Sequence, residues 1–439
     1  MDFVAAGLLC IAILLFLIGI GLQIGLSFIL SGFISSYLLL GFGRSVSMLG
    51  QAAYYSVASP TWVAIPLFIL MGSFAANGNL AKMAYESLAR LTRKIHGSLL
   101  IATCFSCGVF GAVSGSSIAT TAIFGKMALP EMLEKNYNKP LSVGCIASAG
   151  TFASMIPPSM MLIIYALFTQ QSIGMLFAAG LLPGIVTAVS YAILIYVLVK
   201  RNPGLAPNLS SINDRVVSKR KSAVGVLPIL AISFVVLGGL YSGAFTPTEA
   251  AAAGALVTLI TGYFLKQYTS SKVIGAFRES ASVTAMLFLV NIGALFYSRI
   301  LALTGLPTEV AIALTELNVS PIFILLGVML LMFFLGMIMV PIAIYALTLP
   351  VVMPVLLELG YDPIWFGIIA LKLTEIGAIT PPVGLNVFAI KGVIPKKYNV
   401  SMSEVYKGCM PFLAVDVVLL GFFVAFPGLV LWLPSVIWQ

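Results

Sequence analysis

Long apolar runs separated by short polar connections occupy nearly the whole chain. A helix that crosses a membrane needs roughly 20 apolar residues, and runs of that length recur from the first residues to the last. The segment 43–60 is more polar and is expected to form a loop. Uninterrupted helices are predicted at about 3–20, 24–41, 61–78, 176–199, 223–240, 247–265, 280–303 and 408–433. The pattern predicts an all-α polytopic membrane protein.

Two further apolar stretches contain small residues at membrane depth. The stretch 97–127 is too long for one span and too short for two, and its middle, 108–117, is rich in Gly and Ser. Irregular backbone is tolerated at that depth only where it is buried in protein or lines a cavity. A re-entrant hairpin therefore fits 97–127, and the stretch 320–357, which contains Gly336, predicts a second one.

Two proline pairs interrupt the helices that follow these hairpins, at 141–170 and 365–394. In each half of the chain a single proline stands 27 residues before the pair, and the two sets are offset by 224 residues. The sets are Pro130/Pro157/Pro158 and Pro354/Pro381/Pro382. Paired discontinuous helices in repeated halves are typical of secondary transporters whose site lies where the repeats meet.

Composition excludes a water-soluble enzyme. The chain is 60% hydrophobic and 8% charged, its mean hydropathy is +1.11, and its 40 glycines and 23 prolines are spread through apolar runs. Cys104 and Cys107 have CxxC spacing, but the only histidine is His96 and no second Cys or His cluster completes a zinc site. No nucleophile–base arrangement and no nucleotide-binding loop is present. We therefore expect no enzymatic activity and no organic cofactor.

The net charge of +9 is explained by the membrane topology of the chain and does not indicate a nucleic-acid partner. Apart from Arg44, Arg299 and Lys372, every basic residue lies in one of five short bands between apolar segments. Lys and Arg collect in cytoplasmic loops of membrane proteins. The bands therefore place the N-terminus outside, turn the first hairpin toward the cytoplasm and turn the second, which has no basic residue at its far end, toward the periplasm. The two repeats are thus expected to be inverted.

The apolar runs and the bands of basic residues divide the chain into five segments. We expect the most polar part, a basic cytoplasmic linker, to separate the two halves, and a closing helix to end the second. The predicted boundaries are scaffold helices at 1–78, a first transport repeat at 79–199, the linker at 200–222, scaffold helices at 223–303 and a second transport repeat at 304–439.

Small and hydroxyl residues at the hairpins and breaks are the candidates for a cation site. Na⁺ is a hard cation that takes carbonyl and hydroxyl oxygens, and backbone unwound by Gly and Pro supplies them. For the Ser/Gly run alone, ordinary small-residue helix packing is the alternative; the matching break in the other half favours ion binding. The hydroxyls of Ser116, Ser117 and Thr120, together with Asn386 after the second break, are candidate substrate contacts.

Ionisable residues inside apolar spans are costly unless they are paired or functional. Arg299 precedes the second hairpin, and its guanidinium suits a bidentate grip on a carboxylate or sulfonate; a snorkelling arginine near a helix end is the alternative. Lys372 and Glu375 are three residues apart and can neutralise each other or contact substrate. Glu249 is interpreted as a first-turn acid, and Asp416 has no explanation from the sequence.

Three motifs carry a resemblance to a known family. They are Ser114-Gly115-Ser116-Ser117, Thr246-Pro247-Thr248-Glu249-Ala250-Ala251 and Gly377-Ala378-Ile379-Thr380-Pro381-Pro382-Val383-Gly384. In this order and spacing the chain resembles the large membrane (M) subunit of tripartite ATP-independent periplasmic (TRAP) transporters, the DctM-like family. The resemblance covers essentially the whole length.

The resemblance implies an elevator-type, Na⁺-driven importer of small organic acids in the bacterial or archaeal cytoplasmic (inner) membrane. It implies two partners, a soluble periplasmic substrate-binding protein and a small four-helix membrane subunit, expected here as a separate polypeptide. Arg299 matches the family's substrate arginine. Two or more Na⁺ ions are expected at positions that match Ser114, Gly115, Ser116, Gly150, Thr151, Gly336, Gly377 and Thr380.

Two other functions and several substrates stay open at this point. An anion-selective channel would need no ion coupling, and an intramembrane hydrolase would use Ser114. C4-dicarboxylates, sialic acid, other sugar acids and sulfonates all present an anionic group that one arginine can hold.

Overall fold

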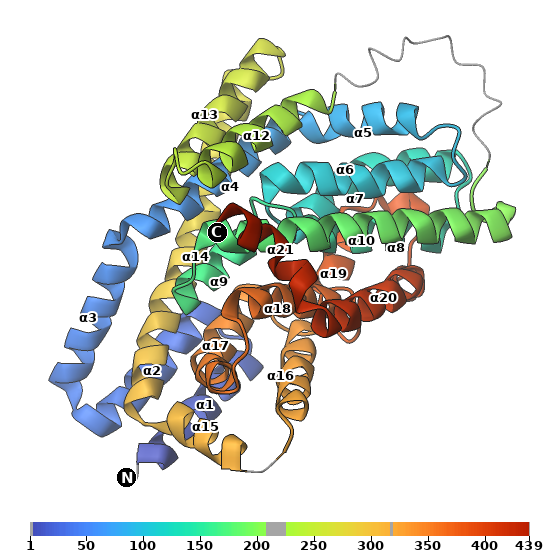
Figure 1. The fold of residues 1–439 in the computed structure, drawn as a ribbon. Coiled ribbons are helices and arrows are strands. Elements are labelled where there is room, and N and C mark those ends of the chain that lie inside the picture. The colour runs from blue at the N-terminus through green and yellow to red at the C-terminus, as the bar shows by residue number, and fades with distance from the viewer. Residues whose placement is uncertain (1–2, 208–224, 317–318, 439) are drawn as a thin grey trace.

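The structure, a computed structural model, describes residues 3–207, 225–316 and 319–438. Every regular element in these ranges is a helix, which confirms the predicted all-α class (Figure 1). Of the predicted linker at 200–222, residues 208–222 lie outside the described residues.

The N-terminal region contains one helix that the sequence did not predict. Helices α1 (Phe3–Gly19), α2 (Ile24–Leu40) and α4 (Ala64–Asn77) match the expected runs, but α3 (Phe42–Ala58) occupies the segment predicted as a loop. That prediction was wrong because polarity was taken as a sign of irregular backbone. In α3 the serines are accommodated by bonds to the preceding turn, as in Ser56, whose hydroxyl donates to the Ala52 carbonyl at 2.6 Å.

The first repeat forms the expected hairpin and broken helix. After the amphipathic helix α5 (Leu80–Leu91), the hairpin consists of α6 (Ser98–Ser114) and α7 (Ser117–Glu134). The broken helix consists of α8 (Lys139–Ala153) and α9 (Met160–Thr169), and α10 (Ile173–Arg201) follows. Both proline pairs of the chain have a cis peptide bond.

The middle of the chain begins with α12 (Leu227–Tyr241) and α13 (Pro247–Phe264). Thr246 and Glu249 form a capping box at the start of α13, as the first-turn interpretation of Glu249 requires. The next helix, α14 (Ser270–Leu303), begins ten residues earlier than predicted because its polar first part packs on α4 through Phe277 and Phe74. The helix α15 (Leu306–Glu316), which was not predicted, follows it.

The second repeat has the same plan as the first. Helices α16 (Pro321–Gly336) and α17 (Pro341–Glu358) form its hairpin, and α18 (Pro363–Gly377) and α19 (Leu385–Val393) form its broken helix. The closing segment, predicted as one helix, is divided into α20 (Met402–Ala425) and α21 (Pro427–Ile437). Pro427 has no amide hydrogen and stands at the first turn of α21, where none is needed, so the helix restarts there.

The two repeats interlock around their breaks. Each hairpin packs on the first half of its own broken helix, α6 and α7 on α8, and α16 and α17 on α18. The second half of each broken helix contacts the other repeat: α9 packs on α17 and α18, and α19 packs on α7 and α8. Beside this body, α14 runs along α2 and α3, with α3 at the edge of the molecule (Figure 1).

Five helical segments of the described ranges are long and apolar enough to cross a membrane, and seven shorter helices are apolar. The five are Pro60–Asn77, Ile173–Arg201, Ser270–Leu303, Pro341–Glu358 and Met402–Ala425. These helices agree with a multi-pass membrane protein.

Helix α20 crosses α8 at a point where neither helix has room for a side chain. A methyl group on Gly408 would overlap the carbonyl of Pro140, and one on Gly144 would overlap the backbone of Gly408. Gly421, on the same helix α20, has no atom within 4 Å of the equivalent position. Such small-residue crossings let helix backbones approach closely inside a membrane.

We expect Gly408→Ala to destabilise the protein by about 1–3 kcal/mol, because the added methyl must push α20 away from α8. Gly421→Ala adds the same methyl to the same helix in open space and should leave stability unchanged. Thermal unfolding of the purified variants in one detergent measures both. Equal melting temperatures for the two variants would contradict the packing described here.

Candidate functional site

The tip of the first hairpin is a tight turn stabilised by its own hydroxyls. Helix α6 ends at Ser114 and is followed by Gly115, whose φ of +59° a side chain would strain. The Ser114 and Thr120 hydroxyls lie 3.0 Å apart across the turn. The Ser116 hydroxyl accepts a hydrogen bond from the Ala119 amide at 3.3 Å and so caps α7. Four of the predicted residues therefore form one structural unit.

Each hairpin tip is hydrogen-bonded to the break of its own repeat. The Met160 amide, at the start of α9, donates to the Gly115 carbonyl at 3.3 Å. The Gly384 amide, just before α19, donates to the Met337 carbonyl at 3.2 Å. Met160 and Gly384 are separated by 224 residues, the offset of the proline sets, and Gly115 and Met337 by 222, two residues short of it. The repeat seen in the sequence is thus also a repeat of the contact that joins tip and break.

Small residues bring each hairpin close to the end of the helix before its break. A side chain on Gly111 of α6 would meet the Ala153 backbone at the end of α8. In the second repeat, Gly336 lies against Thr374 and Gly377, with its ideal Cβ position 3.4 Å from the Gly377 Cα. Backbone carbonyls of the breaks therefore lie directly against the tips.

Hydroxyl groups at the breaks bond to carbonyls of their own helix. Thr151 donates to the Ser148 carbonyl at 2.6 Å, and Thr380 donates to the Ile376 carbonyl at 2.7 Å. Thr151 is 2% exposed and Thr380 is 9% exposed. Each hydroxyl donates its proton to a carbonyl of its own helix. The lone pairs of its oxygen can therefore accept a hydrogen bond or ligate a cation.

Polar bonds also connect the two repeats. The Ser154 hydroxyl, at the end of α8, donates to Glu375 Oε1 on α18 at 2.7 Å. The Asn386 side-chain amide, on α19, donates to the Ala147 carbonyl of α8 at 3.3 Å. The first break is therefore held against both halves of the second broken helix.

The buried lysine has a different partner from the one considered in the sequence. Lys372 Nζ lies 2.6 Å from Asp416 Oδ1 on α20, with both side chains at most 2% exposed. The Tyr191 hydroxyl donates to the second oxygen of Asp416 at 2.6 Å. Neither of the two interpretations left open for Lys372, pairing with Glu375 or contact with substrate, included this acid, which α20 brings to the lysine. Asp416, which the sequence left unexplained, is thereby explained.

The predicted site residues fall into two groups and one outlier. Ser117 of α7 adjoins Gly150 of α8, since an ideal Cβ on Gly150 would lie 3.0 Å from the Ser117 carbonyl oxygen. Gly336, Gly377 and Thr380 meet at the second tip and break. Arg299 is exposed on α14 and makes no hydrogen bond or ion pair within the described ranges. Sequence reasoning did not single out Thr121, which lies beside Gly150 and whose buried hydroxyl has no partner.

The donor set suits Na⁺ and not a transition metal. Where the chain is described, no group of three or more His, Cys, Asp or Glu side chains could hold a metal ion. The tips and breaks offer hydroxyl and carbonyl oxygens instead, which are the ligands that hard cations prefer. These residues therefore fit the ion that the sequence led us to expect.

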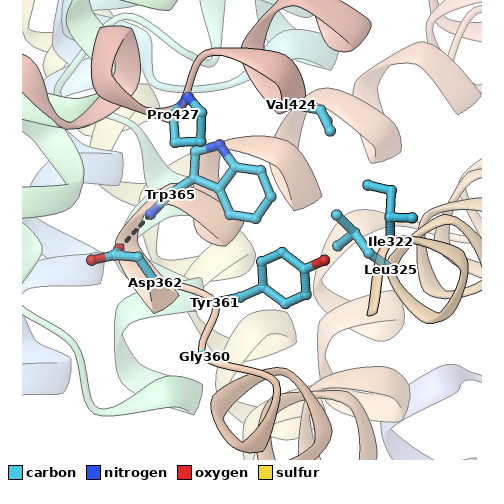
Figure 2. A pocket seen from close by; sticks show the side chains of 8 residues that line it. All are labelled: Ile322, Leu325, Gly360, Tyr361, Asp362, Trp365, Val424 and Pro427. Atoms are coloured by element: carbon cyan, nitrogen blue, oxygen red, sulfur yellow. Dashed lines mark hydrogen bonds between the residues drawn. The ribbon is translucent and has the colours of Figure 1, made fainter. Parts of the chain in front are cut away.

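A pocket of about 240 Å³ lies elsewhere, at the base of the second hairpin. It is lined mainly by apolar groups from α16, the α17–α18 turn and the α20–α21 junction, including the stacked rings of Tyr361 and Trp365 (Figure 2). Its acid, Asp362, is used as a helix cap and accepts the Trp365 amide at 2.9 Å. This pocket is separate from the tips and breaks.

The sequence matches the family described as "Tripartite ATP-independent periplasmic transporter, DctM component" over residues 11–429. The chain belongs to this family. It is 35% identical to the C4-dicarboxylate TRAP transporter large permease protein DctM of Pseudomonas aeruginosa, over 85% of this chain and 86% of that protein. It is 32% identical to the isethionate TRAP transporter permease protein DctMQ of Oleidesulfovibrio alaskensis, over 84% of this chain and 57% of that longer protein.

The fold also resembles a solved structure. The YdaH transporter of Alcanivorax borkumensis, described as having an unusual topology, superposes with a TM-score of 0.61 over 90% of this chain and 89% of that one. At 14% identity the likeness concerns the fold alone.

This DctM-family chain is a large permease of the TRAP type and a multi-pass protein of the inner membrane. Its relatives are transporter permeases and not enzymes, which confirms that prediction. The intramembrane hydrolase is thereby excluded.

We expect Lys372→Met to destabilise this permease by about 3–5 kcal/mol, because it leaves the buried Asp416 carboxylate without its cation. The double variant Lys372→Met/Asp416→Asn should recover much of that loss, since it removes both charges together. Lys82→Met is the matched control: its partner Glu86 is 3.9 Å away and both side chains are at least half exposed, so stability should barely change. Melting temperatures give the comparison, and a double variant no better than the single one would argue against a coupled pair.

Proposed function

We propose that this permease imports a small organic anion across the inner membrane, driven by Na⁺, by an elevator movement of its two repeats. The observation that carries the proposal is the pair of equivalent contacts in which each tip is bonded to its own break. Two such contacts, related by the repeat, form one oxygen-rich region in each half, as expected for ion sites of secondary transporters.

In this mechanism the tips and breaks act together. Bound Na⁺ supplies the positive charge that draws the freed oxygens of a tip and a break toward one point. The Ser114–Ser116 turn and Thr151 hold one ion, and Gly336, Gly377 and Thr380 hold another. The hydroxyls of Ser116, Ser117 and Thr120 then face the anionic head group. Arg299, which lies on α14 outside both groups, is proposed to supply its countercharge.

The interlocked repeats support a rigid moving body. Bonds such as Ser154 to Glu375 and Tyr191 to Asp416 join elements of both repeats. Against the scaffold, α17 packs on α14 through apolar residues, with Ala346 in one cluster with Ala294 and Phe296. Apolar contacts can slide without leaving buried polar groups unpaired, so they suit a surface along which the body moves.

The substrate class and the partner proteins are inferred from the relatives. C4-dicarboxylates and isethionate both present a carboxylate or sulfonate, which a single arginine binds through two parallel hydrogen bonds. We therefore propose a small carboxylate or sulfonate as the substrate class, delivered by a periplasmic substrate-binding protein. A separate small membrane subunit completes the proposed complex.

Na⁺ should raise the melting temperature of the purified protein when NaCl replaces choline chloride at constant ionic strength. A ligand of the native state stabilises it by RT ln(1 + [L]/Kd), so the rise should saturate. Thr380→Val should reduce the rise. Thr348→Val is the matched control, because Thr348 makes the same 2.7 Å bond to its own helix but lies in unbroken α17. A flat response to Na⁺ would reject sodium coupling and favour a proton-driven transporter or a channel.

Arg299→Ala should abolish substrate uptake into proteoliposomes under a Na⁺ gradient while leaving the Na⁺-dependent rise in melting temperature intact. Arg278→Ala removes the same charge from an exposed position on the same helix α14 and should transport normally. Normal uptake by Arg299→Ala would remove this residue from the substrate site. Uptake that neither saturates nor depends on Na⁺ in the wild type would identify a channel.

A further inference from the structure

Three charged side chains are buried in the described part of the chain, and they do not balance. Lys372, Glu375 and Asp416 are each 1% exposed. One positive and two negative groups leave a net buried charge of −1 when all three are ionised. An uncompensated charge in the interior is strongly unfavourable, so either a proton or a further cation must neutralise this region.

Lys372 forms its ion pair with Asp416. Besides its 2.6 Å contact with Asp416 Oδ1, Lys372 Nζ is 3.4 Å from the Thr187 hydroxyl. Both oxygens of Asp416 are used, because Tyr191 donates to the other one. The Lys372–Asp416 pair is thus self-contained, and the unbalanced charge belongs to Glu375.

Glu375 has far fewer partners than a buried carboxylate needs. Its Oε1 accepts from the Ser154 hydroxyl at 2.7 Å, but the same hydroxyl lies 2.8 Å from the Thr151 carbonyl. A hydroxyl has one proton to donate, so the two acceptors share it. Glu375 Oε2 is buried and has no hydrogen-bond partner within 3.5 Å, although the Ser117 side chain of α7 lies close to the carboxylate. A carboxylate can accept about four hydrogen bonds, so most of its capacity is unused.

Further oxygens without partners adjoin the same face of α8. Residues 147, 150, 151 and 154 lie on one side of this helix, at spacings of three and four. Thr121 lies beside Gly150, and its buried Oγ1 has no partner. Asn386 donates to the Ala147 carbonyl, but its Oδ1 has no partner. Oxygens of three helices from both repeats therefore adjoin this face, which we call the α8 strip.

We propose that a monovalent cation binds against the α8 strip with Glu375 as its anionic ligand. A single positive charge brings the buried total to zero, whereas a divalent ion would leave an excess of +1. Na⁺ fits the oxygen ligands, and the inference rests on the proposed function only in taking Na⁺ as the cation. This ion lies next to the one proposed at the first tip, whose ligand Thr151 is also on the α8 strip, and it differs from that ion in having a carboxylate ligand.

The site has a structural consequence for the permease. Glu375 stands on α18 of the second repeat, and Ser154 and Thr121 stand on α8 and α7 of the first. A cation held by Glu375 in this position neutralises the carboxylate at the contact between α18 and α8, where the repeats meet. It therefore couples cation binding to the contact between the repeats.

Binding of ²²Na⁺ to the purified full-length protein, measured by equilibrium dialysis, tests the proposal. Glu375→Gln should bind one Na⁺ fewer per chain than the wild type. Glu358→Gln removes the same charge from an exposed position at the end of α17 and should bind the wild-type number. An unchanged count in Glu375→Gln would overturn the proposal.

Melting temperatures separate a cation site from a merely structural acid. In choline chloride, Glu375→Gln should melt at or above the wild-type temperature, because the amide carries no unpaired buried charge. In NaCl the wild type should gain more than the variant. If instead lowering the pH in choline chloride raises the wild-type melting temperature to that of the variant, and Na⁺ gives the wild type no advantage, the positive charge is a proton and the proposal fails.

The two proposals fail differently. Na⁺-dependent uptake with an unchanged ion count in Glu375→Gln rejects the α8-strip site and leaves sodium-driven import intact. Uptake that is independent of Na⁺, with one bound ion lost in Glu375→Gln, rejects sodium-driven import and supports the site.

Discussion

Backbone hydrogen bonding inside an apolar medium is the constraint on which this structure depends. A helix that stops within the membrane leaves amides and carbonyls without partners, and no water is present to satisfy them. The chain stops helices at four such places, two tips and two breaks, and pairs them. The Gly115 carbonyl accepts a hydrogen bond from the Met160 amide, and the Met337 carbonyl accepts one from the Gly384 amide. Each tip thereby satisfies part of the backbone that a proline pair has freed.

That pairing requires close approach, and close approach requires small residues. Because Gly111 has no side chain, the end of α8 packs directly against it, and the end of α18 packs against Gly336 in the same way. The same principle extends outward, where Gly144 and Gly408 bring α20 against α8. Because α20 is held so close, it carries Asp416 to Lys372 and neutralises a lysine that the broken helix would otherwise bury alone. Backbone packing and charge pairing are therefore two parts of one arrangement.

The features that sequence reasoning found are those marked by residues with special backbone chemistry. Prolines at a fixed spacing revealed the breaks, and runs of Gly and Ser revealed the first tip. Helix α3 was missed because its serines bond to their own helix, so that polarity no longer signals a loop. The division between α20 and α21 at Pro427 was missed because the proline lies within a continuous apolar run. The partner of Lys372 could not be found along the chain, since Asp416 is 44 residues away and meets it only through tertiary packing.

The buried charges near the second break differ in how completely they are paired. The Lys372–Asp416 pair, whose charges cancel, fixes α18 against α20, because separating the partners would leave two buried charges. Glu375, one helical turn later, has a single shared hydrogen bond and an oxygen without a partner. Its free energy therefore depends on what occupies its surroundings, and these include helices of both repeats. A fixed pair and, one turn further along the same face of α18, an unsatisfied acid give the helix one rigid attachment and one that depends on its surroundings.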